Sequence, residues 1–301
     1  MSGMTRDDVQ ALLAIPAILL VGVLLTMAGS AGGTRVGAVP VFAACAALCF
    51  AVNWVVFVPS YLARTEHFFD LTGSATYISA VLLAAFLTET LDARSLLLAA
   101  LILVWAGRLG TFLFARVRRE GKDGRFDQIK QSLPRFFMVW TLQGLWVLVC
   151  AACALAALTA SVRVPLDVFA IVGALLWLAG FVLEVAADRQ KSAFRADPGN
   201  AGRFIDRGVW TWSRHPNYAG EILLWAGIAI IAFPALTGWQ LVTLISPLFV
   251  YVLLTRISGL PLLERRAERK WGDDPEYQAY KARTPILWPV PGRRGSRPQP
   301  D

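Results

Sequence analysis

The chain has 301 residues, of which 56% are hydrophobic and only 17% are charged, and its mean hydropathy is +0.54. This composition lies outside the range of soluble globular proteins. The net charge of +8 does not indicate a nucleic-acid partner, because the basic residues gather in loops between apolar segments rather than in a separate soluble domain. We therefore predict an integral membrane protein.

Eight apolar segments follow one another along the chain, and most approach the roughly 20 residues that a helix needs to cross a bilayer core. They are residues 12–28, 39–63, 75–91, 96–115, 136–162, 168–187, 222–236 and 241–255. The first is expected to be a retained helix, because no small-residue cleavage site follows it. The last two are short enough that one is a candidate for a broken or tilted helix, so the expected count is seven or eight.

Lys and Arg gather in three regions, residues 116–135, 189–214 and 265–297. Two predicted spans separate each region from the next, so all three fall on the same side of the membrane. Basic loops stay in the cytoplasm. The pattern predicts that both termini are cytoplasmic, and we expect the membrane to be a bacterial inner membrane.

The expected fold class is all-α, a polytopic membrane helix bundle whose cytoplasmic loops cap a cofactor site. Residues 1–288 are predicted to form one domain, with 10–118 on the substrate side and 119–288 on the cofactor side. A Pro/Arg-rich tail, residues 289–301, is predicted to be disordered. No metal-binding spacing occurs, and the four cysteines, all within spans, are expected to be packing residues.

A polar segment, residues 188–218, precedes the seventh span and ends in the sequence WSRHPNYAGE, residues 212–221. Pro216 suits the first turn of a helix, so Arg214 and His215 would lie at its partly positive end, which favours an anion. Asn217 and Glu221 share one face of that helix. The alternative is an interfacial anchor without chemistry, in which aromatic rings and Arg lie at the headgroup level.

These residues carry a resemblance to a known family. The WSRHPNYAGE segment, the polar stretch before it, the Leu142-Gln143-Gly144 stretch and the sequence WGDDPEYQAY at 271–280 together resemble the steroid 5α-reductase superfamily, in particular its bacterial members of unknown function. The resemblance covers residues 108–288. It implies a membrane-embedded, NADPH-dependent reductase of a conjugated carbon–carbon double bond in a steroid or other apolar lipid.

The resemblance also implies roles for individual residues. Those expected to contact the adenosine and nicotinamide parts of NADPH are Asp188, Arg203, Asn217 and Glu221. Those expected to help bind its phosphates and ring are Arg108, Arg195, Arg214, His215, Tyr218 and Arg256.

The substrate end departs from the family pattern. Steroid 5α-reductases hold the substrate ketone with a Glu and a Tyr, and aligning the Arg108 helix places Trp105 where that Tyr is expected. We propose Tyr77, Glu66 and Tyr61 as substitutes for this pair. The predicted catalytic residues, which would donate a hydrogen bond to the substrate carbonyl, are Tyr77, Glu66 and Gln143.

Two other functions stay open. Membrane methyltransferases that modify isoprenylcysteine or phospholipid are similar at the RHPxY segment but use S-adenosylmethionine, which has no phosphates. A transporter or structural membrane protein would need ionisable residues along a pathway through the bilayer, whereas here they concentrate at the cytoplasmic end.

Overall fold

The computed structural model describes residues 4–120, 124 and 126–289. Within these residues, eight helices are long and apolar enough to cross a membrane. The only strands among the described residues are β1 (Arg35–Val36) and β2 (Val39–Pro40), an antiparallel pair. The all-α membrane bundle predicted from the sequence is therefore confirmed. The predicted disordered tail lies, except for Pro289, outside the described residues.

The chain divides into two compact units. Unit 1 comprises residues 1–171 and 228–246, and unit 2 comprises residues 172–227 and 247–301. The chain passes from one unit to the other within continuous helices. The boundaries at 171 and 227 fall within α6 (Val168–Ala196) and α7 (Pro216–Ala232). The expected functional division near residue 118 stays a prediction.

Unit 1 is built around α5 (Leu133–Leu158), which packs against α1 (Arg6–Ser30), α2 (Val41–Leu62), α3 (Phe69–Leu87) and α4 (Ala93–Glu120). In its most apolar stretch 89% of α5 is buried, against 28–44% for those four helices. Small Ala, Cys and Gly side chains let helices approach α5 from several sides. All four cysteines are buried, as expected for packing residues.

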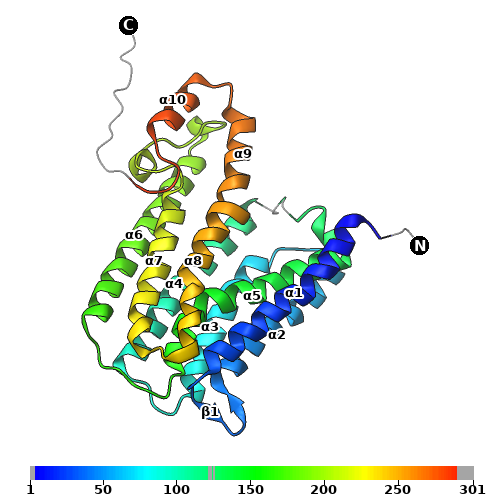
Figure 1. Ribbon diagram of the computed structural model, residues 1–301. Coiled ribbons are helices and arrows are strands. Elements are labelled where there is room, and N and C mark those ends of the chain that lie inside the picture. Colours follow the sequence, from blue (N-terminus) through cyan, green and yellow to red (C-terminus); the bar gives the residue numbers. More distant parts are fainter. Residues whose placement is uncertain (1–3, 121–123, 125, 290–301) are drawn as a thin grey trace. The chain divides into compact units, whose positions relative to one another are not determined.

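Unit 2 contains most of α6 and α7, the π turn η6 (Leu253–Ile257), α9 (Leu260–Trp271) and α10 (Pro275–Arg283). Short 3-10 turns, η2 (Pro198–Asn200) and η3 (Gly208–Thr211), connect α6 to α7. The last apolar stretch begins in η5 (Gly238–Leu244) and α8 (Ile245–Val252) and is interrupted between η6 and α9, so the expectation of a broken final helix is confirmed (Figure 1).

One buried guanidinium joins three segments of unit 1. Arg94, at the start of α4, donates hydrogen bonds to the carbonyl oxygens of Ile231 (2.6 Å), Pro165 (2.7 Å) and Val164 (3.2 Å). It also pairs with Asp167 at 2.8 Å, and only 1% of its side chain is exposed. Arg94 thus satisfies carbonyl groups at the end of α7 and in the segment that leads into α6.

We predict that Arg94→Ala destabilises the protein by at least about 1–3 kcal/mol, because the backbone carbonyls that accept hydrogen bonds from Arg94 lose their donor. The melting temperature in detergent measures the effect. Arg119→Ala, an exposed position in the last turn of the same helix, is the control and should change stability little. Equal melting temperatures for the two variants would contradict this role of Arg94.

Candidate functional site

The site predicted from the WSRHPNY segment lies in unit 2, where α7 begins at Pro216 as expected. The predicted sixth span ends at residue 187, but α6 continues as a helix to Ala196. Asp188 and Arg195 therefore lie on the last turns of a helix and not in a loop. Asp188 and Glu184, one turn earlier, are both buried.

A seam of glycines brings α6 and α7 together. A Cβ atom at Gly220 would lie 2.5 Å from the carbonyl oxygen of Gly180 and 2.7 Å from the backbone nitrogen of Glu184. Seven residues further on, a Cβ at Gly227 would lie 2.5 Å from the carbonyl oxygen of Gly173. The two backbones touch, so the end of α6 is held beside the first turns of α7.

The chemical centre of unit 2 is a shared carboxylate. Oε1 of Glu264, on α9, lies 2.7 Å from Nε2 of His215, and its Oε2 pairs with the guanidinium of Arg214. Tyr218 stacks against His215 with ring centroids 5.8 Å apart. The ring of Tyr218 also packs closely on Gly259, where the chain turns into α9.

Two nitrogen atoms of this cluster are buried and have no hydrogen-bond partner among the described residues, namely Nε of Arg214 and Nδ1 of His215. Buried polar atoms in folded proteins are usually hydrogen-bonded, so an exception needs an explanation. Burial lowers the pKa of His215, with the positive charges of Lys191 and Arg214 adding to the effect against the opposing influence of Glu264. His215 is therefore neutral at pH 7.

The C-terminal segment fixes this cluster in place. The backbone N–H of Arg214 donates to the carbonyl of Pro285 (2.9 Å), and the hydroxyl of Ser213 donates to the carbonyl of Leu287 (2.7 Å). The Tyr280 hydroxyl donates to the carbonyl of Trp210 (2.7 Å), and burial raises the pKa of Tyr280. The C-terminal segment thus holds the residues that connect η3 to α7.

The remaining predicted cofactor residues of unit 2 differ in their exposure to solvent. Asn217 and Glu221 are half-buried on the first two turns of α7. Arg195, Arg203 and Arg256 are exposed. Arg203 lies 4.0 Å from Glu276, an exposed pair that contributes little to stability. Glu264 and Lys191 were not predicted as site residues. One feature of the sequence could have indicated Glu264 as a site residue: it is the first acidic residue of α9, a helix in which basic residues predominate.

Four predicted residues belong to unit 1. Arg108 is half-buried on α4 with its guanidinium over the ring of Phe112. Tyr77, on α3, is 5% exposed and meets Trp105 edge to face at 5.1 Å. Glu66, just before α3, is buried and pairs with Lys130 at 2.6 Å.

The fourth, Gln143 on α5, is part of a buried polar chain. Its amide nitrogen donates both to Oδ1 of Asn53 (3.0 Å) and to the carbonyl of Phe69 (2.9 Å). Asn53 in turn donates to the hydroxyl of Thr76 at 3.3 Å. Gln143 thus donates hydrogen bonds to two neighbouring helices, α2 and α3, and both of its amide hydrogens are engaged.

The fold and this cluster define a multi-pass helical membrane protein with a polar site where a helix enters its apolar segment. The chain belongs to the family described as protein of unknown function DUF1295, whose sequence profile matches residues 56–284. It is 24% identical over 227 residues to an uncharacterized protein of Schizosaccharomyces pombe, a match that covers 65% of this chain and 63% of the yeast protein. The chain thus spans less than two thirds of that relative's length. No solved structure matches the chain.

The glycine seam generates a prediction. Gly220→Ala places a methyl group against the backbone of α6, and overpacking of this kind costs about 1–3 kcal/mol. We expect a lower melting temperature and weaker ligand binding in unit 2. Gly107→Ala, on α4, is the matched control because a Cβ there meets no atom within 4 Å. If Gly220→Ala is as stable as Gly107→Ala, the seam does not hold the two helices.

Proposed function

We propose that this protein is a membrane-embedded oxidoreductase that uses NADPH to reduce a carbon–carbon double bond conjugated to a carbonyl in an apolar lipid, such as a steroid enone. The observation that carries the proposal is the Arg214–Glu264–His215 cluster with its two buried, unpartnered nitrogen atoms. The family gives further support, since DUF1295 belongs to the steroid 5α-reductase-like superfamily.

The charges of unit 2 suit a phosphate-bearing cofactor. Lys191 acts electrostatically on His215, and Arg195, Arg203 and Arg256 stand exposed on the same unit. Guanidinium groups bind phosphates through several hydrogen bonds at once. S-adenosylmethionine has no phosphate to use these groups, which favours NADPH over the methyltransferase alternative.

The hydrogen-bond chemistry of the cluster points to a neutral part of the cofactor as well. A carboxylate only accepts hydrogen bonds. Nε2 of His215 therefore carries the ring hydrogen and donates a hydrogen bond to Glu264. Nδ1 of the neutral ring is then an acceptor, while Nε–H of Arg214 is a donor. A carboxamide offers both a carbonyl oxygen and an amide N–H, and the edge of adenine likewise offers an acceptor and a donor, so either group has the atoms to use this donor and this acceptor.

When bound, NADPH supplies the hydride that adds to the β-carbon of the enone. A proton then adds to the α-carbon, which leaves the saturated ketone and NADP⁺. Negative charge develops on the carbonyl oxygen during the hydride step, so the protein must present a hydrogen-bond donor to that oxygen. The candidates are Tyr77, Glu66 and Gln143.

Their surroundings rank these three donors. Gln143 has both amide hydrogens engaged, and donating to a substrate would break a buried hydrogen bond. The ion pair with Lys130 favours the ionised form of Glu66, which has no proton to donate. The Tyr77 side chain has a phenolic hydroxyl, which can donate a hydrogen bond. Tyr77 is therefore the first candidate for the donor.

The cofactor is tested with purified full-length protein. NADPH should bind at least about ten-fold more tightly than NADH, because the 2′-phosphate gains charge-assisted hydrogen bonds. Equal affinities would argue against the proposal. Binding of S-adenosylmethionine in place of NADPH would favour the methyltransferase, and binding of neither would favour a transporter or structural protein.

The same assay tests which neutral group His215 recognises. Replacing the carboxamide of NADP⁺ with an acetyl group removes the N–H donor and should weaken binding about ten-fold, because Nδ1 is left unpaired. His215→Phe keeps a ring beside Tyr218 but has no nitrogen, so the two cofactors should then bind alike. If the variant instead loses its preference for adenine over hypoxanthine in the cofactor, Arg214 and His215 bind the adenine base. An unchanged preference in both comparisons would exclude this role.

The substrate is tested by NADPH oxidation with a 3-keto-4-ene steroid, followed by identification of the reduced product. We expect slow turnover by the unmodified protein. At least one of Tyr77→Phe, Glu66→Gln and Gln143→Ala should lower kcat more than about ten-fold without weakening NADPH binding, and Tyr77→Phe is expected to have the largest effect. If NADPH binds but no enone is consumed, the steroid substrate is wrong and the cofactor assignment stands.

A further inference from the structure

An exposed apolar stripe runs along the last helical stretch of unit 2. Its members are Leu248, Val252, Ile257 and Leu262. They are four residues apart in α8 and five apart across η6, a π turn whose hydrogen bonds join residues five apart. Large apolar side chains therefore stay exposed about once per turn. In a candidate membrane span, such a stripe indicates a surface that faces lipid acyl chains.

Three exposed arginines follow this stripe on α9, namely Arg265, Arg266 and Arg269. At 100° per residue, these three residues and Leu262 fall within about 100° of the helix circumference. The side of α9 that begins with an exposed leucine therefore continues with three positive charges. We call Arg265, Arg266 and Arg269 the arginine face.

The acidic residues of α9 are engaged elsewhere in unit 2. Glu264 lies between Arg214 and His215, as described above. Glu268 pairs with Lys281 at 2.6 Å and accepts a hydrogen bond from Gln278. Within the described residues, no ion pair joins either carboxylate to the arginine face. The charges of α9 are thus separated, with the carboxylates bound to the rest of the unit and the guanidinium groups exposed.

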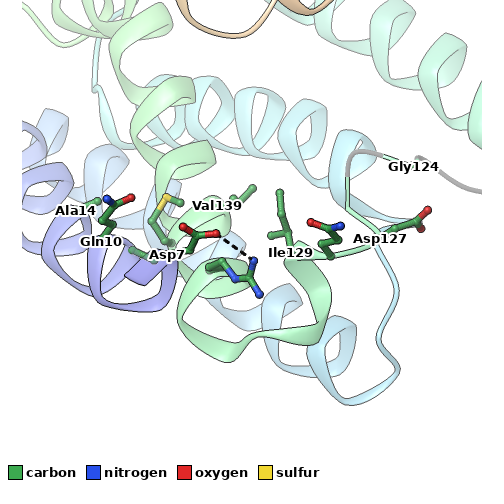
Figure 2. A pocket seen from close by; sticks show the side chains of 11 residues that line it. Asp7, Gln10, Ala14, Gly124, Asp127, Ile129 and Val139 are labelled. Carbon is green, nitrogen blue, oxygen red and sulfur yellow. Dashed lines mark ion pairs between the residues drawn. The ribbon is translucent and has the colours of Figure 1, made fainter. Parts of the chain in front are cut away.

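Other arginines near helix ends have acidic partners. In unit 1, Arg135 lies 3.2 Å from Asp8 and forms an ion pair with Asp7 at 3.8 Å, which Figure 2 shows. On the arginine face, Arg269 instead has like charges three and four residues before it. Positive charges at these spacings are neighbours on a helix and repel one another. An anion from outside the chain would relieve this repulsion.

The position of the arginine face relative to a bilayer follows from the length of the span. The stretch Gly238–Trp271 has 34 residues, and about 20 are enough to cross the hydrocarbon core. Residues 238–263 contain one charged residue, Arg256, whereas residues 264–271 contain six. Because charged side chains are costly inside the core, the end that projects from it is α9. The arginine face then lies just beyond the acyl chains, at the level of the lipid headgroups.

We propose that the arginine face binds the headgroups of anionic phospholipids, whose acyl chains lie along the stripe that ends at Leu262. Guanidinium groups bind phosphate through several hydrogen bonds, and each basic residue near an anionic membrane surface adds to the attraction. Phosphatidylcholine also has a phosphate, but its choline group cancels the negative charge. The proposal does not depend on the reductase activity.

The test is native mass spectrometry of the purified full-length protein in detergent, titrated with phosphatidylglycerol and phosphatidylcholine of identical acyl chains. We expect phosphatidylglycerol to bind at least about ten-fold more tightly. The double variant Arg265→Gln, Arg269→Gln should weaken the binding of phosphatidylglycerol at least about ten-fold and leave that of phosphatidylcholine unchanged. Because both positions are exposed, the melting temperature should not change. Arg265→Lys, Arg269→Lys keeps the charge and should keep the preference.

The matched control is Arg195→Gln, Arg203→Gln, which removes the same charge from two exposed positions of unit 2 outside α9. It should keep the preference for phosphatidylglycerol. Soluble glycerophosphoglycerol, which has the headgroup without acyl chains, should not compete with the whole lipid.

Four results would overturn the proposal. The first two are equal binding of the two lipids and a Gln variant of α9 that keeps the preference. The third is a control variant that loses the preference to the same extent, because the net charge of the unit would then select the lipid. The fourth is effective competition by glycerophosphoglycerol, because the site would then bind a free phosphate ester.

Discussion

The contact between the backbones of α6 and α7 is the constraint on which the site of unit 2 depends. Gly180 and Gly220 let each helix present backbone atoms to the other at distances that no side chain would allow. In a membrane, where lipid is as apolar as the helices, such close packing is a principal source of helix association. It holds the carboxylate-bearing end of α6, with Glu184, beside the turn where Arg214 and His215 enter α7.

Two sets of buried polar side chains, one in each unit, differ in how completely they are hydrogen-bonded. In unit 1, Arg94 fully satisfies carbonyl groups at helix ends, and Gln143 and Asn53 form a closed chain of hydrogen bonds. These hydrogen bonds contribute to the stability of unit 1. In unit 2, the cluster around Glu264 leaves two buried nitrogens without partners among the described residues. Incomplete satisfaction is costly, and at this cluster of charged and titratable side chains it supports the proposed binding site.

Much of the fold was predictable because bilayer thickness imposes a length and an apolar composition that a sequence displays directly. Boundaries were less so. α6 runs on to Ala196 because polar residues can continue a helix beyond the membrane, and α3 begins at Phe69, before its apolar stretch. The site was predicted in part, since WSRHPNY is local in sequence. Glu264 is about 50 residues from Arg214 and His215, and no periodicity links them. The glycine seam was missed because it depends on register between two helices.

Because the helix is interrupted between η6 and α9, the position of α9 depends on the contacts that its own side chains make. Within unit 2, Glu264 joins α9 to the start of α7 by one carboxylate held between Arg214 and His215. Any ligand group that competes for either side chain also competes with α9. Linkage requires the effect to be reciprocal, so whatever stabilises the docked helix weakens such a ligand by the same factor. A ligand that displaced Glu264 from either side chain would therefore also weaken the attachment of α9 to the start of α7.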